Sequence, residues 1–486
     1  MEWLPSEIIS NLVAMIADMI CGSICLPAAS ALGTIAENIW EDQLTAIRSA
    51  PVQETGIAEV PSSLRPSSLR LVLWTLLIVY VFNFLDRQIV NILAELIKRD
   101  LNLSDTQLGL MTGLAFALFY TVLGIPIARF ADRPTSNRVG LISVALLIWS
   151  GMTAICGLAQ NFVQLLLARI GVGVGEAGCT PAAHSLIADM TTPETRPAAI
   201  SFYSLGIPIG GLLGLVLGGQ LADAFGWRMA FVVVGLPGVL LAGFVWLLLR
   251  DPRMSAAAKA LRNESPKLEP VSAKVALSEI FGSRAFVLLM IAGSFSAFLS
   301  YGKATWTVIF FQRSHGLTPG ETGLWLGLLG GLAGVIGTWL GGWLATRYGR
   351  VNRRHVLTAP AIGMLIATPI QFAAFSVGNW TVSLLLLFLP YVFNSLYLGP
   401  TYSSAQGLVR PQVRAVASAS MLFAQNLIGL GLGPLFFGIL SDWVKPMAGP
   451  DSVRWVLYGA AWLGLFPAFF FWRASLRLNE ELDRKT

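Results

Sequence analysis

Long apolar runs recur along this chain and restrict the environment in which it can fold. A segment needs about 20 apolar residues to cross the hydrocarbon core of a bilayer as a helix. Only 12% of the 486 residues are charged, against about 25% in soluble domains. The sequence therefore predicts an all-α polytopic membrane protein with twelve transmembrane helices. The expected spans after Arg70 are 71–97, 106–128, 139–159, 162–188, 198–222, 228–249, 285–311, 322–345, 355–377, 380–408, 415–440 and 453–473.

Basic residues are distributed unevenly between the two sets of loops. The loops after even-numbered spans, taken with the two flanks of the bundle, hold 23 of the 33 Lys and Arg residues, whereas the opposite loops hold six. An excess of Lys and Arg marks cytoplasmic loops, so we expect both ends of the bundle to be cytoplasmic. A net charge of +6 is compatible with nucleic-acid binding, but the basic residues gather in alternate loops, so we expect no nucleic-acid partner.

A repeat divides the spans into two sets of six. The motif that contains Asp132 recurs 214 positions later around Thr346, and the motif that ends in Asp223 recurs 219 positions later, ending in Asp442. Tandem six-helix units are the build of transporters that work by alternating access. We therefore predict two pseudo-symmetric halves. The expected organisation is an N-terminal half at 69–250, a polar cytoplasmic linker at 251–284, a C-terminal half at 285–478 and a cytoplasmic tail at 479–486.

Residues 1–68 precede the first span and carry no functional motif. The segment Ile8–Ile35 is moderately apolar, but Asp18 and Pro27 interrupt it and no basic residue precedes it. It is therefore a poor signal peptide. We expect a poorly ordered or interfacial extension; a thirteenth span is the alternative.

Charged residues within the spans are the strongest indication of function. Asp86 and Arg87 lie in the middle of the first span, Arg169 and Glu176 in the fourth, and Lys303 in the seventh. A charge at membrane depth costs at least ~2.5 kcal/mol, and such residues commonly mark ion or substrate pathways. This pattern favours a transporter over an anchor.

Asp86 is the first candidate for proton binding. Burial and a neighbouring cation act in opposite directions on a carboxyl group, so movement of Arg87 or Arg169 would bind or release its proton. The alternative is a static ion pair with one of these arginines. Because adjacent helix positions point in different directions, Asp86 and Arg87 are expected to face different partners.

Arg169 and Glu176 are seven residues apart and share one face of the fourth span, about 10.5 Å apart along the axis. Each is expected to pair with the first span. Glu176 is the second candidate for proton coupling, and Arg87 and Arg169 form the predicted charge network. Direct contact with substrate and a purely structural charge clamp both remain open.

The sequence resembles the major facilitator superfamily over residues ~70–475. The resemblance is carried by the twelve spans, by Ala128-Arg-Phe-Ala-Asp132-Arg133 after the second span and by its degenerate second copy, in which Thr346-Arg347 replaces the acidic-basic pair. It implies a gating motif of Asp132, Arg133 and Arg347. More narrowly, Asn83-Phe-Leu-Asp86-Arg87 and Gly173-Val-Gly-Glu176-Ala resemble the spinster branch, whose animal members export sphingoid phosphates and related lysolipids.

The resemblance also implies a cavity lined by the first, fourth, seventh and tenth spans. The substrate-binding residues expected there are Asn83, Arg87, Arg169, Lys303, Trp306, Asn394 and Tyr397. Lys303 would alternatively extend to the interface, and Asn394 and Tyr397 of the tenth span would alternatively serve packing. Three cations against two carboxylates suit an amphiphile with an anionic head.

We therefore expect a proton-coupled secondary active transporter of a lysolipid or sphingoid-phosphate type of substrate. It would be a monomeric, multi-pass protein of a bacterial inner membrane, with the substrate and membrane lipids as partners. A multidrug or small-molecule exporter is the alternative, and a non-transporting receptor or scaffold is a more remote one. No metal-ligand spacing and no nucleophile arrangement is visible, so we expect no enzyme, no metal and no cofactor other than the proton as coupling ion.

Overall fold

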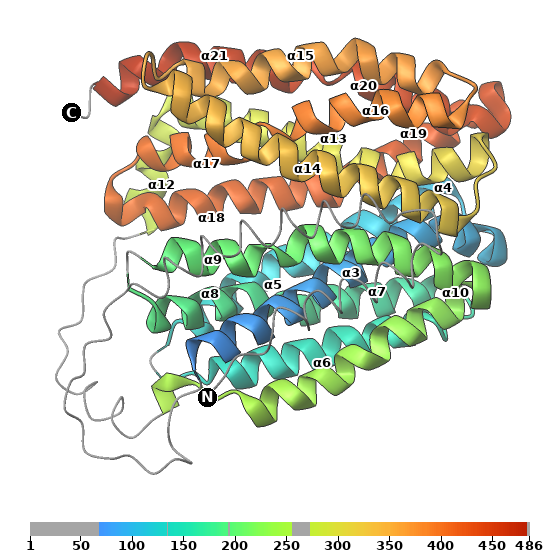
Figure 1. Ribbon diagram of the computed structural model, residues 1–486, viewed down its shortest axis with the longest axis horizontal. Coiled ribbons are helices and arrows are strands. Elements are labelled where there is room, and N and C mark those ends of the chain that lie inside the picture. The colour runs from blue at the N-terminus through green and yellow to red at the C-terminus, as the bar shows by residue number, and fades with distance from the viewer. Residues whose placement is uncertain (1–67, 134, 193–194, 255–272, 484–486) are drawn as a thin grey trace, which may run out of the picture. The chain divides into compact units, whose positions relative to one another are not determined.

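The computed structural model describes residues 68–133, 135–192, 195–254 and 273–483. The predicted N-terminal extension, apart from residue 68, lies outside these ranges, as do residues 255–272 of the predicted linker and the last three residues. Every regular element in the described part of the chain is a helix, and Figure 1 shows these helices as two groups, coloured blue to green and yellow to red.

The first half supplies six crossings. Its second crossing runs through α4, η3 and α5, its fourth through α7 and α8, and its fifth through α9 and the start of α10. The chain reverses inside α10 because Gly226 adopts φ 78° and ψ 166°, which glycine tolerates without steric cost. The elements are α3 (Leu69–Leu101), α4 (Asp105–Gly109), η3 (Leu110–Leu114), α5 (Ala115–Ala131), α6 (Arg138–Cys156), α7 (Phe162–Glu176), α8 (Cys179–Met190), α9 (Arg196–Ser204) and α10 (Gly206–Leu248).

The second half supplies the other six crossings, preceded by two short helices of the linker region. Those two are η4 (Pro252–Met254) and α12 (Ala273–Gly282). The second half contains α13 (Arg284–Ser314), α14 (Pro319–Gly349), α15 (His355–Ser376), α16 (Trp380–Ser395), α17 (Leu398–Gly407), η5 (Pro411–Val413), α18 (Arg414–Ala424), η6 (Gln425–Leu432), α19 (Gly433–Ala448), η7 (Gly449–Asp451), α20 (Ser452–Trp462) and α21 (Leu465–Asp483).

The predicted number of spans is confirmed. Ten helical runs in the described residues are long and apolar enough to cross a membrane. Two of them, Ala198–Leu248 and Val416–Leu482, have 51 and 67 residues, which is enough for two crossings each at about 20 residues per crossing. The twelve-helix architecture of the major facilitator fold follows.

Residues 187–201, which include the turn from α8 to α9, are the described part of the smaller of two compact units in the chain. Local bonds hold this turn: the Thr191 hydroxyl donates to the carbonyl of Ile187 at 2.7 Å, and Arg196 Nη2 donates to the carbonyl of Ala188 at 2.9 Å.

Apolar side chains cover the outer surface of the bundle as well as its core. Leu240, Leu247 and Trp339 are each about two-thirds or more exposed. A soluble protein of this size would not tolerate such a surface, whereas hydrocarbon does. The main core cluster includes Leu93 of α3, Phe310 of α13 and Phe437 of α19. Apolar packing therefore joins helices of the two halves.

The start of the linker is tied to α6 by a buried ion pair. The Asp251 carboxylate accepts from the backbone N–H of Arg138 at 2.6 Å, from its Nη2 at 2.6 Å and from its Nε at 3.0 Å, and both side chains are fully buried. Burial raises the pKa of Asp251, but hydrogen bonds from Arg138 and from the backbone of Arg253 outweigh it and hold the pKa below its usual value.

Candidate functional site

A buried ion pair links the first and fourth spans. Arg87 Nε of α3 donates to Glu176 Oε2 of α7 at 2.6 Å, and the Glu176 side chain is fully buried. The guanidinium carbon of Arg87 lies 5.1, 5.0 and 4.5 Å from the ring centroids of Phe84, Phe116 and Tyr120. Aromatic faces attract a cation at this range. Arg87 is therefore held by one carboxylate and three rings.

Asp86 and Arg169 lie beside this pair and form no ion pair with any residue that the structure describes. Asp86 is 0% and Arg169 1% exposed. Both carboxylate oxygens of Asp86, and Nε and Nη1 of Arg169, have no hydrogen-bond partner among the described residues. The side chains of Trp149 and Thr153 of α6 lie next to Asp86. As expected from their adjacency, Asp86 and Arg87 face different partners.

Two glycines allow α7 to reach its neighbours. A methyl group at Gly173 would lie 2.6 Å from the carbonyl oxygen of Phe116 on α5, and one at Gly175 would lie 2.6 Å from the backbone nitrogen of Trp149 on α6. Any side chain at these positions would push the helices apart. The glycines in the fourth-span motif therefore set how closely α7 packs against α5 and α6.

A small cavity of about 40 Å³ lies where this cluster meets the second half. Arg87, Arg169, Asn91 and Gln88 line it from the first half, and Tyr301, Ala304 and Thr305 of α13 are among its lining residues from the second. The Thr305 hydroxyl donates to Asn91 Oδ1 at 2.8 Å. Two of the predicted substrate-binding residues, Arg87 and Arg169, thus lie at one cavity between the halves.

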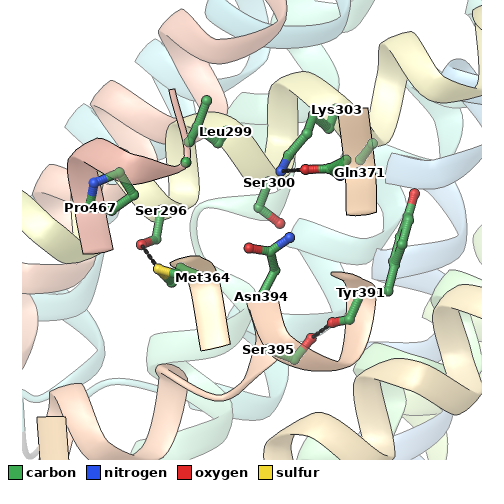
Figure 2. A pocket seen from close by; sticks show the side chains of 12 residues that line it. Ser296, Leu299, Ser300, Lys303, Met364, Gln371, Tyr391, Asn394, Ser395 and Pro467 are labelled. Atoms are coloured by element: carbon green, nitrogen blue, oxygen red, sulfur yellow. Dashed lines mark hydrogen bonds between the residues drawn. The ribbon is translucent and has the colours of Figure 1, made fainter. Parts of the chain in front are cut away.

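A second cavity, of about 110 Å³, lies within the second half. Lys303 lines it and is 7% exposed, and its Nζ donates to Gln371 Oε1 of α15 at 2.9 Å. Figure 2 shows the Ser300 hydroxyl and the Asn394 amide pointing into the same space. Lys303 therefore does not extend to the interface, and Asn394 joins it at the cavity. The full lining is Ser296, Leu299, Ser300, Lys303, Ala304, Met364, Gln371, Tyr391, Asn394, Ser395, Gly464 and Pro467.

Three other predicted substrate-binding residues line neither of these two cavities. Asn83 is 1% exposed beside Glu176. Trp306 is 0% exposed, and its indole N–H donates to the carbonyl of Pro434 at 3.0 Å. Tyr397 belongs to an apolar core cluster of the second half and contacts Phe471. The two aromatic residues serve packing here, which for Tyr397 was the expected alternative.

The predicted gating residues lie at helix ends. Asp132 is the C-cap of α5, and Arg133 places its guanidinium 5.7 Å from the ring of Phe130. Arg347 lies in the last turn of α14, where a cation interacts favourably with the helix dipole. All three side chains are exposed. The structure therefore leaves their gating role a prediction.

The repeated Asp442 motif forms a bond between the halves. Asp442 of α19 accepts from the backbone N–H of Asp105 at 3.1 Å and from the backbone N–H and hydroxyl of Thr106, both at 2.7 Å. These donors begin α4, in the first half. The carboxylate thus satisfies N–H groups that a helix start leaves without intrahelical partners.

The equivalent aspartate of the first half makes the equivalent bond. Asp223 of α10 accepts from the Thr318 hydroxyl at 2.8 Å and from the backbone N–H of Gly320 at 2.9 Å, at the start of α14. The two capped helices also share a capping box, Ser104 with Gln107 and Thr318 with Glu321. The sequence repeat is therefore a repeated contact between the halves.

One glycine of each repeat makes this contact possible. A methyl group at Gly219 would lie 2.3 Å from the carbonyl oxygen of Pro319, and one at Gly438 would lie 2.3 Å from that of Asp105. In both copies the glycine lets the helix approach, and the aspartate one turn later caps the partner helix. We call these two contacts, Gly219–Asp223 on α14 and Gly438–Asp442 on α4, the paired caps.

An ion network that the sequence analysis missed lies at the same end of the bundle. Arg313 of α13 donates to Glu95 Oε2 at 2.7 Å and to both oxygens of Asp105 at 3.0 Å, and Lys98 also pairs with Asp105. Ser441 donates to Asp105 at 2.6 Å. These residues lie at the ends of spans, where charges are common. Their positions in the sequence therefore did not indicate an ion network between the halves.

Comparison with known proteins agrees with this architecture. The family model of the Major Facilitator Superfamily matches residues 76–434. An MFS-type efflux pump of Mycolicibacterium smegmatis is 34% identical over 410 residues, which are 84% of this chain and 92% of that protein. Protein spinster homolog 1 of Homo sapiens is 28% identical over 400 residues, covering 78% and 74% of the two chains.

A solved structure is similar over the same region. It is the crystal structure of a bacterial homologue of the human lysosomal transporter Spinster, in an inward-facing and unoccupied conformation. The TM-score is 0.76 at 32% identity, and the match covers 85% of this chain and 98% of that one. With its twelve-span fold, its buried charge cluster and these relatives, the chain belongs to the major facilitator superfamily as a spinster-like transporter.

Proposed function

We propose that this protein carries an anionic, single-chain amphiphile of the lysolipid or sphingoid-phosphate type across a bacterial inner membrane and couples this transport to protons. It works as a monomer, with both ends of the bundle in the cytoplasm, since Lys and Arg gather in the loops on that side. The paired caps then lie at the extracytoplasmic end. These contacts between the halves at that end favour a substrate path that opens to the cytoplasm.

One observation carries the proposal of proton coupling. Asp86 is completely buried in a membrane span, and its oxygens lack hydrogen-bond partners among the described residues. An ionised carboxylate in this setting is far costlier to bury than a neutral one. Arg169 lies close enough to interact with it electrostatically. A conformational change that moves Arg169 would therefore change how readily Asp86 binds a proton.

The charge and polarity of the cavities support an anionic substrate. Two arginines line the cavity between the halves, and a lysine lines the cavity of the second half. Apolar residues such as Leu299 and Met364 complete the second lining. A ligand with a negative head and an apolar chain matches both components.

The coupling is tested with purified protein in liposomes that carry a pH gradient. We expect Asp86→Asn to fold but to lose gradient-driven uptake of a fluorescent lysolipid. The matched control is Asp100→Asn, which removes an exposed carboxylate that pairs with Arg228 at 2.5 Å. Gradient-driven uptake by Asp86→Asn at the rate of the control would refute the proposed coupling.

Multidrug efflux is the second candidate function. It is favoured by the 34% identity to a protein named as an MFS-type efflux pump. A panel of cationic and neutral drugs, tested in the same liposomes beside lysolipids, separates the two functions. Transport of the drugs without transport of any anionic amphiphile would establish efflux instead.

A further inference from the structure

We propose that the cavity around Lys303 is the subsite that binds the anionic head of the substrate, a phosphate monoester or a carboxylate. This inference rests on the proposed function, and it assigns the head to the second half rather than to the arginines of the first. Lys303, Ser300 and Asn394 would hold the head, and the cavity between the halves would remain the site of the buried charge cluster.

Lys303 is a buried cation whose contact in this cavity is a neutral group. Its ammonium donates to the Gln371 amide oxygen at 2.9 Å, and none of the twelve residues that line the cavity is acidic. An ammonium group has three donors, and the amide uses one of them. Burying such a charge is costly unless a counter-charge is present. A bound anion would supply that counter-charge and accept the remaining donors.

The other polar groups at the cavity suit an oxyanion. The hydroxyl of Ser300 and the amide of Asn394 point into it (Figure 2), and each can donate a hydrogen bond. Gln371 is oriented by Lys303, and the Ser395 hydroxyl is engaged with the carbonyl of Tyr391 at 2.9 Å. The available donors therefore converge on one place beside the ammonium group.

The size of the cavity matches a head group rather than a whole amphiphile. Its volume is about 110 Å³, somewhat below the ~150 Å³ of an engineered cavity that holds benzene. Part of the lining is apolar and can contact the first carbons of the substrate's hydrocarbon chain; it consists of Leu299, Met364 and Pro467. Ala304 lines both this cavity and the cavity between the halves, so the two cavities are neighbours.

The two arginines at the cavity between the halves are less available for the same task, because each lies near a buried carboxylate. Arg169 lies beside Asp86. Arg87 already pairs with Glu176 at 2.6 Å and lies against three aromatic rings. Binding of an anion there would have to compete with a fully buried carboxylate. Lys303 has no such competitor at its cavity, and this difference assigns the head to the second half.

The test measures head-charge preference directly. Binding of dodecyl phosphate and of dodecanol to the detergent-purified full chain is measured by titration calorimetry, and the ratio of the two affinities is compared between variants. We expect wild type to prefer the phosphate by about 10-fold or more. Lys303→Gln should abolish the preference, Lys303→Arg should keep most of it, and Lys445→Gln, the same substitution at an exposed lysine, should keep all of it.

A further variant locates the head if it binds elsewhere. The double variant Arg87→Gln/Glu176→Gln removes the ion pair of the first half without stranding either charge. Loss of the preference in this variant, together with its retention in Lys303→Gln, would overturn the assignment to Lys303 while leaving an anionic substrate in place. Equal affinity of wild type for the phosphate and the alcohol would instead refute both the subsite and the proposed substrate class.

Discussion

Buried ions in this protein are held in two different ways. Arg138 and Asp251 make three hydrogen bonds with one another, and Arg138 also donates to the carbonyl of Ser185. Asp86 and Arg169 keep polar atoms without hydrogen-bond partners among the described residues. A buried ion pair whose hydrogen bonds are made rigidifies a structure. A buried polar group without a partner is costly, so a change of conformation or protonation that supplies a partner or removes the charge is favoured. The Arg138–Asp251 pair therefore anchors the linker to α6, whereas the setting of Asp86 is the basis of the proposed proton coupling.

We expect Asp251→Asn to destabilise the protein by about 3–5 kcal/mol, because it removes the carboxylate charge that accepts three hydrogen bonds from the buried Arg138. The native pKa of Asp251 is depressed. Its contribution is therefore fully present above the unfolded value of about 3.9 and is lost as pH falls through the lower folded pKa. Thermal unfolding is measured in detergent from pH 7 to pH 3. The difference in unfolding midpoint between wild type and variant should become smaller at acidic pH.

Asp100→Asn is the control for this measurement. Its side chain is 43% exposed and pairs with an arginine that is 41% exposed, so its removal should change stability by no more than about 0.5 kcal/mol. A gap between wild type and Asp251→Asn that stays constant over this pH range would contradict the role assigned to the Asp251 carboxylate.

At the scale of the element, α7 depends on its glycines for its place in the first half. Glycine in a helix interior costs up to about 1 kcal/mol relative to alanine. Close packing of α7 against the backbones of α5 and α6, which Gly173 and Gly175 permit, offsets this cost. The helix can then present Arg169 and Glu176 to the first span at the required depth.

We expect Gly175→Ala to destabilise the protein by about 1–3 kcal/mol, since its methyl group would meet the backbone of Trp149 at 2.6 Å. Gly151→Ala is the matched control on α6. No atom lies within 4 Å of its added methyl group, so it should be neutral or stabilising by up to about 1 kcal/mol. Thermal unfolding of the two variants in the same detergent compares them, and equal midpoints would show that α7 does not need this close approach.

At the scale of the whole molecule, the duplication has produced two equivalent contacts between the halves. Each half contributes one glycine and one aspartate to the start of a helix in the other half. Such caps are worth about 0.5–2 kcal/mol each, and charged residues add to the dipole interaction at a helix N-terminus. A few kcal/mol is the size of difference that separates two populated conformations. The paired caps are therefore suited to bias an equilibrium without locking it.

We expect Asp223→Asn/Asp442→Asn to shift the protein toward a conformation that is open at this end. Spin labels on cysteines introduced at Leu158 and Gly378, both exposed at this end, would report it in a background without the four native cysteines. Double electron–electron resonance should show an additional population of longer distances between the two labels in the double variant. Asp100→Asn, whose ion pair lies within the first half, should leave the distribution as in wild type, and an unchanged distribution in the double variant would argue against a gating role for the caps.

The spans, the two halves and the charged positions follow from the sequence itself. An apolar run of bilayer length has one stable arrangement in lipid, because a helix satisfies all of its backbone groups internally. The twelve spans and the major facilitator fold were predicted correctly for this reason. The duplication was visible because both copies of the Asp223 and Asp442 motif kept their glycine and aspartate.

Only the tertiary structure decided which residues meet. The sequence placed Lys303, Trp306 and Tyr397 together as cavity candidates, but Lys303 lines a cavity whereas Trp306 and Tyr397 are packed in the core. It also gave Asp86 two possible partners and left Arg313 unremarked, although Arg313 bridges the halves through Glu95 and Asp105. Helix rotation and depth fix these contacts, and both depend on how side chains of distant helices pack against one another, which local apolarity and spacing do not encode.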